Sequence, residues 1–300
     1  QLSAAGGHHL LFIGPPGVGK TMLAKSLTEL MPKLSTQEIF ETMRIYSILN
    51  LLKKLNQRPF RQIHQSSTLV SLIGGGNSLR PGEISLANNG ILFLDEIAEF
   101  PRSHLEALRQ PLEDRKVYLS RNSGSIIFPA NFTLIAAMNP CPCGFSGDTE
   151  QECICTSQNI LNYQKKISGP FFDRIDLTVN VNRPKLNSQN SLPDSSFEEL
   201  KLRILTAREV QSKRYKNENF STNSCLSGAT LKKYLKFSPS AEEFLEESIQ
   251  KLNLSARSHL HLLKTGQTIA DLENSPQITK LHLSEALQFR QQNLWSISRH

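Results

Sequence analysis

The sequence is poor in cysteine and has no long apolar stretch. It contains five cysteines in 300 residues, and none of its apolar runs approaches the roughly 20 residues that a membrane-spanning helix requires. The amino terminus also lacks the basic and then apolar pattern of a secretory signal. We therefore expect a cytoplasmic protein without membrane segments, whose thiols are reduced. The net charge of +7 permits a polyanionic partner but does not predict one, because an ordinary solvated surface gives the same value.

Two kinds of sequence pattern divide the chain. Up to residue 183, short apolar runs alternate with helical patterns, and "ILFLDEI" and "FTLIAAMN" are typical of buried parallel strands. "HLEALRQPLEDRK" predicts a helix, "VYLSRNSGSIIF" predicts a hairpin, and the glycine-rich segment 71–90 predicts a loop. A stretch rich in Ser, Asn and Pro follows, and only helical patterns come after it. These patterns predict an α/β domain over residues 1–183, a linker over 184–197 and a helical domain over 198–300.

The segment "GPPGVGKT" fits the phosphate-binding pattern G-x-x-x-x-G-K-[ST]. It follows an apolar run typical of a strand and precedes a helical pattern, which is the context that this loop requires. Backbone N–H groups and the start of the helix would bind phosphate oxygens, Lys20 would meet the β- and γ-phosphates, and Thr21 would bind Mg²⁺. An accidental glycine-rich turn is the alternative. The predicted ATP-binding residues are Gly14, Pro15, Pro16, Gly17, Val18, Gly19, Lys20 and Thr21.

A pair of carboxylates ends the apolar run "ILFLDEI". At the carboxyl end of a buried parallel strand, such side chains lie at the edge of the sheet where ligands bind. We expect Asp95 to complete the Mg²⁺ site with Thr21, and Glu96 to orient and polarise the attacking water. The alternative is an aspartate that caps the next helix, which the phosphate loop elsewhere in the sequence makes less favourable.

Several longer strings resemble one family over nearly the whole chain. They are "RPFRQIHQSSTLVSLIGGG", "RPGEISLANNGILFLDEI", "LRQPLED", "PANFTLIAAMNPCPCG", "GPFFDRIDL", "LSARSHLHLLKTGQTIADLE" and "EALQFR". In these strings the sequence is similar to the magnesium-chelatase-like AAA+ ATPases of the ComM/YifB type. The resemblance implies a P-loop AAA+ αβα core with a parallel sheet, a helical lid domain, and assembly into a homo-hexameric ring that hydrolyses ATP.

The resemblance also implies roles for three further residues. Asn139 matches the residue that orients the lytic water, Arg174 the arginine finger offered to the neighbouring subunit's nucleotide, and Arg257 the lid arginine that closes over the nucleotide. A permanent guanidinium charge suits both arginine roles. Taken alone, Asn139 suits a turn, and Arg257 could be an ordinary surface residue. Arg174 could equally pair with Asp173 or Asp176 on the surface.

The chain departs from the family pattern in its lid and at its start. His261 and Gln267 stand where related sequences usually carry arginine, and Gln65 stands where a second histidine usually follows His64. These changes leave the nucleotide residues intact but affect the expected lid contacts. Family members usually also carry an amino-terminal domain that resembles the protease-like domain of Lon, which this chain lacks. A fragment and a naturally shorter protein are both open interpretations.

Two insertions suggest what the ATPase acts on: residues 64–90 and the hairpin over residues 116–128. In related AAA+ rings such elements line a central pore, and Arg115, Lys116 and Arg121 suit contact with a phosphate backbone. The resemblance implies a DNA partner, branched or single-stranded, and branch migration or helicase activity in natural transformation and recombination. Two alternatives stay open. One is the ATPase subunit of a magnesium chelatase that inserts metal into porphyrin, and the other is a truncated scaffold that does not hydrolyse ATP.

Four of the five cysteines lie in two Cys-x-Cys pairs within "CPCGFSGDTEQECIC". This loop is long enough to fold back and bring Cys141, Cys143, Cys153 and Cys155 to one point, where four thiolates suit tetrahedral Zn²⁺. The spacing is tighter than the usual Cys-x₂-Cys, and four reduced thiols without metal are the alternative. The resemblance assigns this loop to the ComM/YifB type and not to the porphyrin-pathway subunit, so it favours DNA. We expect Cys225 to be an inert packing residue.

Overall fold

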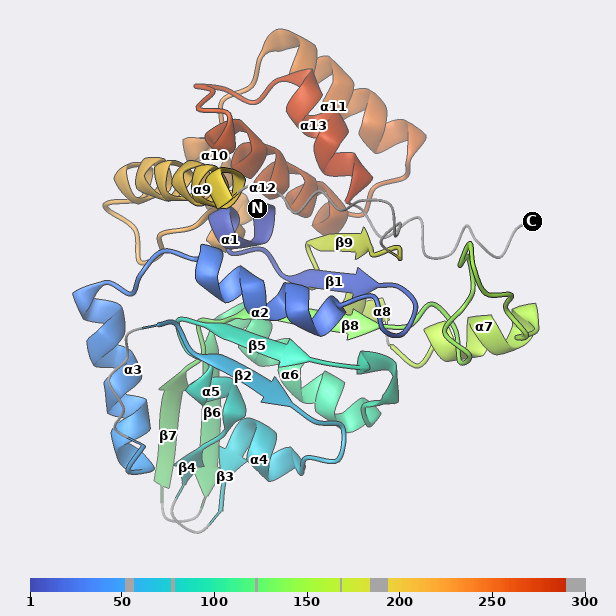
Figure 1. Cartoon of the computed structure of the whole chain (residues 1–300). Coiled ribbons are helices and arrows are strands. Elements are labelled where there is room, and N and C mark those ends of the chain that lie inside the picture. Colours follow the sequence, from blue (N-terminus) through green and yellow to red (C-terminus); the bar gives the residue numbers. More distant parts are fainter. Residues whose placement is uncertain (52–56, 77–78, 122–123, 168, 184–193, 290–300) are drawn as a thin grey trace.

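A computed structural model describes residues 1–51, 57–76, 79–121, 124–167, 169–183 and 194–289. Its centre is a five-stranded sheet in which every neighbouring pair is parallel (Figure 1). The strand order is β2 (Phe60–Ile63), β5 (Ile91–Leu94), β8 (Thr133–Met138), β1 (Leu10–Ile13) and β9 (Leu177–Asn180). The prediction of an α/β core with a parallel sheet, followed by helices, is confirmed.

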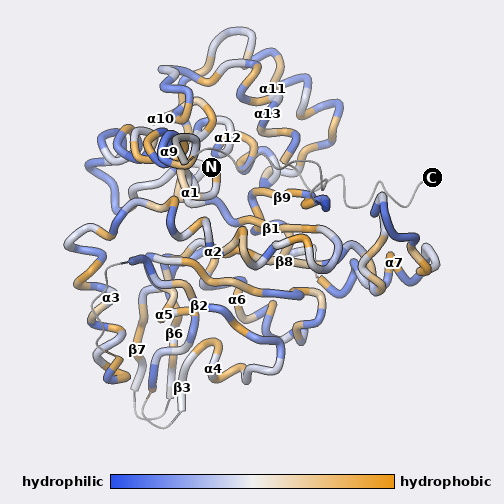
Figure 2. Tube along the Cα trace, in the orientation of Figure 1, coloured by the Kyte–Doolittle hydropathy of each residue, from blue (hydrophilic) through white to orange (hydrophobic). Residues whose placement is uncertain are grey.

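The central strands are almost wholly apolar because both faces of the sheet are covered, and Figure 2 draws them largely in orange. In β1, Leu11 and Ile13 point to one face, while Leu10 and Phe12 point to the other. The first face packs against α6 (Arg102–Asp114), α7 (Ser157–Gln164) and α8 (Gly169–Phe172). The second packs against α1 (Leu2–Gly6), α2 (Lys20–Leu30) and the helices that follow the core. Two buried faces explain why these strands are continuous apolar runs.

The carboxyl-terminal part of the described chain is helical, as predicted. It comprises α9 (Asp194–Arg214), η2 (Asn223–Cys225), α10 (Gly228–Tyr234), α11 (Pro239–Lys251), α12 (Ala256–Leu272) and α13 (Lys280–Gln288). Helix α9 begins four residues before the predicted start of the helical domain, because a polar composition does not distinguish a linker from the first turn of a helix. Residues 184–193 of the predicted linker and residues 290–300 of the predicted helical domain lie outside the described residues.

Residues 71–90 correct a prediction, because they are not simply a loop. They contain the end of α4 (Leu69–Ile73), an antiparallel pair β3 (Gly74–Gly75) and β4 (Arg80–Pro81), and α5 (Glu83–Leu86). The predicted hairpin is confirmed as β6 (Lys116–Arg121) paired with β7 (Gly124–Pro129), and both hairpins extend from the same end of the core (Figure 1). Elements of two to five residues leave too little periodicity in a sequence to be recognised.

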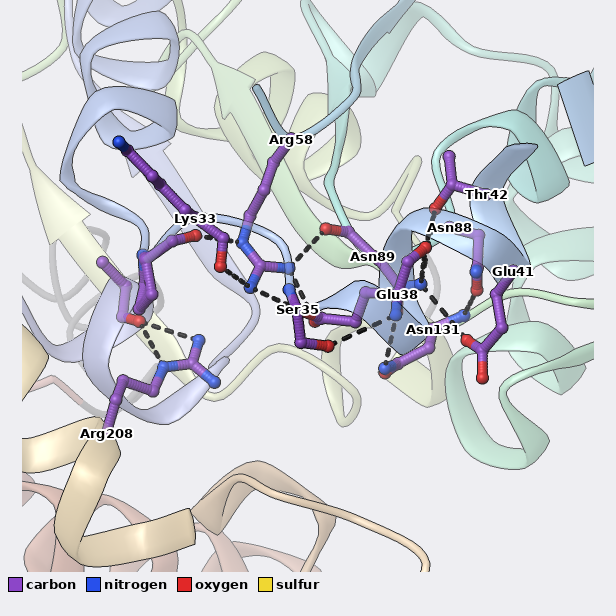
Figure 3. Close-up of polar contacts among 12 residues, drawn as sticks. Lys33, Ser35, Glu38, Glu41, Thr42, Arg58, Asn88, Asn89, Asn131 and Arg208 are labelled. Carbon is purple, nitrogen blue, oxygen red and sulfur yellow. Dashed lines mark hydrogen bonds and ion pairs between the residues drawn. The ribbon is translucent and has the colours of Figure 1, made fainter. Parts of the chain in front are cut away.

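A polar cluster fastens the amino-terminal edge of the sheet (Figure 3). Arg58, just before β2, donates to both carboxylate oxygens of Glu38 and to the carbonyl of Asn89. Glu38 belongs to α3 (Thr36–Ile48), where it completes a capping box with Ser35. Although burial opposes it, the bond from Arg58 lowers the pKa of the Glu38 carboxyl. These contacts hold the edge of the sheet that lies opposite the carboxyl ends of the strands.

Candidate nucleotide-binding site

The turn between β1 and α2 has the backbone that the phosphate-loop pattern predicts. Gly17 and Gly19 have φ angles of 80° and 86°, a region that favours glycine. At Gly14, a β-carbon would lie 2.1 Å from the carbonyl oxygen of Val181, so only glycine fits beside the chain that leaves β9. In the part of the chain that the structure describes, no side chain caps α2 at Gly19. Backbone N–H groups at the start of this helix therefore suit a phosphate anion.

Lys20 lies at the centre of this turn with only 9% of its surface exposed. Its Nζ donates to the carbonyl oxygens of Gly14 and Pro15 at 2.7 and 2.8 Å, and to Oδ1 of Asn139 at 3.1 Å. Burial lowers the pKa of Lys20, and the nearby Asp95 and Glu96 carboxylates oppose this effect. A charged amine surrounded by oxygens in this way is held ready for phosphate oxygens.

The two predicted carboxylates follow β5 directly. The Thr21 hydroxyl donates to Oδ2 of Asp95 at 2.9 Å, so the two predicted Mg²⁺ ligands are in contact. Hydroxyl and carboxylate oxygens are the ligands that Mg²⁺ prefers, which means that this pair fits the ion. Glu96 is exposed and has a φ of 51°, an uncommon conformation for a residue other than glycine. Such strained positions cluster at functional sites.

The sheet explains why these residues meet. β8 lies between β5 and β1, so the carboxyl ends of the three strands are adjacent at one edge. Asn139 directly follows β8, and Lys20 and Asp95 follow β1 and β5. The structure therefore brings together Lys20, Thr21, Asp95 and Asn139, with Glu96 beside them.

Arg174 and Arg257 lie together at a different place. Arg174 follows α8 and is only 9% exposed; its guanidinium donates to the carbonyl oxygen of Arg109 at 3.2 Å and to Oε1 of Glu113 at 2.7 Å. Arg257, near the start of α12, donates to the same Glu113 oxygen. Among the described residues, the polar partners of both arginines lie outside the phosphate loop. The roles expected of Arg174 and Arg257 at a bound nucleotide stay predictions.

Two acidic partners were not foreseen from the sequence. Glu113 accepts hydrogen bonds from both arginines, and nothing in the sequence marked it as their partner beyond its place in "LRQPLED". Arg174 also does not pair with Asp173 or Asp176, the alternative considered above. The Asp176 carboxylate instead contacts His261 of α12 and accepts a hydrogen bond at 2.8 Å from the backbone N–H of His9. His261 therefore joins the helical region to the core.

The four loop cysteines do come together. Their sulfur atoms all lie within 4.8 Å of one another, and those of Cys141, Cys143 and Cys153 are separated by 3.3, 3.6 and 3.7 Å. Four thiolates bound to one zinc ion at the usual distance are about 3.8 Å apart. Although burial opposes it, hydrogen bonds from the backbone at Phe145 and from the Cys141 thiol lower the pKa of Cys143 to about 6. A cation at this point would offset the repulsion among further thiolates, so the donor set fits zinc.

In the described residues, no helix combines the length and the apolar character that a membrane span requires.

The family model described as "Magnesium chelatase, subunit ChlI" matches residues 1–189, and the model described as "Magnesium chelatase, subunit ChlI C-terminal" matches residues 194–290.

Two curated relatives are similar over nearly the whole chain. The protein YifB of Salmonella typhimurium is 44% identical over 296 residues, or 97% of this chain. The competence protein ComM of Haemophilus influenzae is 43% identical over 297 residues, or 96% of this chain. The chain spans 57% of the length of each of these relatives.

Proposed function

The chain belongs to the magnesium chelatase family of AAA+ proteins and is of the ComM/YifB type, and from this premise we propose that it hydrolyses ATP and acts in a ring as a motor on DNA. The observation that carries the ATPase proposal is the convergence of Lys20, Thr21, Asp95 and Asn139 at one sheet edge, with Glu96 beside them. Each supplies a group that phosphoryl transfer from ATP requires.

The residues divide the chemical work by position. Lys20 and the N–H groups at the start of α2 would bind phosphate oxygens, replacing the carbonyl and amide oxygens that Lys20 contacts now. Thr21 and Asp95 would hold Mg²⁺, whose charge stabilises the transferring phosphoryl group. The exposed carboxylate of Glu96 would accept a proton from the attacking water, and the amide of Asn139 would orient that water.

Assembly is supported by the position of Arg174 and Arg257. Because they lie side by side and away from the phosphate loop of their own chain, we propose that both serve the nucleotide of a neighbouring subunit in a homo-hexamer. The test mixes Arg174→Ala chains, which keep an intact phosphate loop, with Lys20→Ala chains, which keep both arginines. ATPase activity should return at mixed interfaces, whereas an assembled mixed ring without activity would contradict arginines acting between subunits.

The DNA proposal is supported by similarity to ComM and by the outward face of the β6–β7 hairpin. Val117, Leu119 and Phe128 point into the core, which leaves Tyr118 and its cross-strand partner Ile127 outward, 48% and 55% exposed. The exposed Lys116 lies on the same face. An exposed aromatic ring beside a lysine suits the bases and backbone of a single strand.

Arg115 and Arg121, the other two basic residues predicted to contact a phosphate backbone, differ in what the structure describes of them. Arg115 donates to Asn131 and Ser224 and is therefore already engaged within the protein. The side chain of Arg121 lies outside the described residues.

An ATPase assay with three added compounds tests the substrate. We expect single-stranded or branched DNA to stimulate hydrolysis, with a stimulation that fades as salt rises because counterions are released on binding. Protoporphyrin should have no effect. Stimulation by protoporphyrin with a chelatase partner, together with indifference to DNA at low salt, would favour the porphyrin-pathway alternative. No hydrolysis under any condition would favour the scaffold.

We also propose that the four loop cysteines bind one structural zinc ion. Purified protein should contain about one zinc per chain, and Cys143→Ser should lower both the zinc content and the melting temperature. Cys225→Ser is the matched control, because Cys225 contacts the Thr222 hydroxyl and is not among the four clustered sulfurs. A metal-free preparation of full stability would contradict the zinc site.

A further inference from the structure

The cysteine loop packs directly on the phosphate loop. Gly144 has a φ of 90°, and a β-carbon at this position would lie 2.7 Å from Cδ of Pro16 and 3.9 Å from Cγ of Asn139. Carbon atoms that are not bonded do not approach to 2.7 Å without displacement. The bare backbone of Gly144 therefore fits against Pro16, inside the phosphate-binding pattern.

A second connection runs along the chain. One residue, Pro140, separates Asn139 from Cys141, and Oδ1 of Asn139 accepts a hydrogen bond from Lys20 at 3.1 Å. The carbonyl oxygen of Pro140 accepts from Nε2 of Gln164 at 3.2 Å. The cysteine loop thus meets the candidate nucleotide site at two points, through Gly144 on Pro16 and through Asn139 on Lys20.

The turn that carries Gly144 is folded around a cysteine. The N–H of Gly144 donates to the carbonyl oxygen of Cys141 at 3.0 Å, and the N–H of Ser146 donates to Sγ of the same residue at 3.3 Å. Cys141 is buried, and its sulfur lies 3.3 Å from that of Cys143 and 3.7 Å from that of Cys153. An ion bound to these sulfurs would fix Cys141, and with it the position of Gly144.

We infer that the metal-binding loop is a structural support of the phosphate loop, so that metal held by the four cysteines sets the nucleotide affinity through Gly144. This inference rests on the proposed nucleotide and zinc sites and adds a coupling between them. It concerns nucleotide affinity, because both contacts of the loop reach residues proposed to bind phosphate, Pro16 and Lys20.

Two alanine variants of the full chain separate the contact from the metal site. Gly144→Ala places a methyl group against Pro16 and leaves all four cysteines in place. Gly147→Ala is the matched control: Gly147 lies in the same loop with a similar φ of 78°, but a β-carbon there meets no atom of the described residues within 4 Å. Both variants carry the strain of alanine at positive φ, and only the first adds the clash.

The measurements are zinc content by atomic emission and affinity for a fluorescent ATP analogue. We expect Gly144→Ala to keep its zinc and to bind the nucleotide at least about tenfold more weakly, while Gly147→Ala keeps both properties. If Gly144→Ala contains zinc and binds the analogue with the affinity of the wild type, the coupling is overturned. The proposed nucleotide and zinc sites would not be affected by that result. An equal loss of affinity in the two variants would also overturn it, because strain in the loop would then suffice.

Chelation of the wild type provides a second measurement that does not depend on how the variants fold. Removing zinc should weaken binding of the same analogue by a similar factor, and restoring zinc should recover it. Unchanged affinity after zinc is removed would contradict the coupling alone. A wild type that never contained zinc would overturn the coupling together with the zinc proposal, and a wild type with zinc that does not bind the analogue would overturn it together with the nucleotide site.

Discussion

The carboxyl edge of the sheet and the seam between the core and the helical region both concentrate charge, but in different ways. At the edge, Asp95 is partly exposed and Glu96 is exposed. We include in the seam the three residues that join the two regions, His8, Asp176 and Arg208, and the adjoining buried pair of the helical region, Arg214 and Asp271. The partners of these residues are other protein groups. For example, the buried carboxylate of Asp271 accepts hydrogen bonds from Arg214, Asn223 and Gln267.

The contrast indicates that the carboxyl edge of the sheet is suited to binding and reaction, whereas the seam is suited to holding packed elements together. Charges that remain accessible to solvent and ligand can change partners during a reaction, whereas buried charges that exchange water for protein partners hold two elements in one geometry. Substitutions at the edge should therefore change nucleotide binding or hydrolysis and leave the free energy of unfolding nearly unchanged. Substitutions in the seam should change stability.

The largest effect should follow from removing the carboxylate of Glu96. Glu96→Gln should retain nucleotide binding and lower hydrolysis by about 10²- to 10⁴-fold, because the carboxylate acts on the water in the transition state. Lys20→Ala should instead abolish nucleotide binding. Glu99→Gln is the matched control, since Glu99 is a nearby carboxylate that pairs with Lys166. Normal hydrolysis by Glu96→Gln would show that another group orients the water.

In the seam, removing the carboxylate of Asp271 should destabilise the fold. Asp271→Ala leaves Arg214 and the buried amide of Asn223 without their acceptor, which should lower the free energy of unfolding by about 3–5 kcal/mol. Urea unfolding measures this value. Lys251→Ala removes an exposed ion pair of similar length, 2.9 Å, and should cost less than about 0.5 kcal/mol. Equal effects of the two variants would contradict the distinction between the buried ion pair of the seam and an exposed ion pair on the surface.

The pH dependence of unfolding should come from the core side of the seam. Burial lowers the pKa of His9 from 6.5 to about 4; Asp176 opposes this effect and Arg115 adds to it. The unfolded chain therefore binds a proton at higher pH than the folded chain does. The stability contributed by neutral His9 is fully present above pH 6.5 and is lost as pH falls towards 4, a change of about 3 kcal/mol.

His9→Asn should make this pH dependence shallower while retaining an acceptor for the N–H of Leu134, which Nδ1 of His9 now accepts. Urea unfolding at several pH values measures the slope. A wild type whose unfolding free energy is flat between pH 6.5 and 4 would mean that His9 does not stay neutral in the folded chain.

The smallest effect should come from the hairpin, which belongs to neither region. Tyr118→Ala should weaken binding of single-stranded DNA by about 1–3 kcal/mol through lost stacking, with little change in the free energy of unfolding. Tyr118→Phe keeps the ring and should bind nearly as the wild type does. Leu281→Ala is the control for an exposed apolar side chain elsewhere, on α13. DNA affinity that does not respond to Tyr118→Ala would exclude this face as the contact.

Much of the nucleotide site could be predicted because its parts are local. The phosphate loop is contiguous in sequence, and its glycines, lysine and threonine act through backbone that they form themselves. Asp95 could be added because it follows a continuous apolar run, and the carboxyl ends of neighbouring parallel strands share an edge. Asn139 was added only through the family resemblance. The edge strand β2 and the helices α7 and α8 were not recognised, since four to eight residues with mixed polarity resemble loops.

The sequence by itself thus determined the α/β core, the helical region and the residues that we propose bind phosphate and metal. Tertiary structure alone decided that Glu113 and Arg257, 144 residues apart, share an ion pair, and that Gly144 packs against Pro16. The physical reason is range: backbone conformation and apolar periodicity are set by neighbours a few residues away. Which residue pairs with a charged side chain, or packs against a glycine, depends instead on how separate elements pack. Many different packings are compatible with the same local sequence pattern.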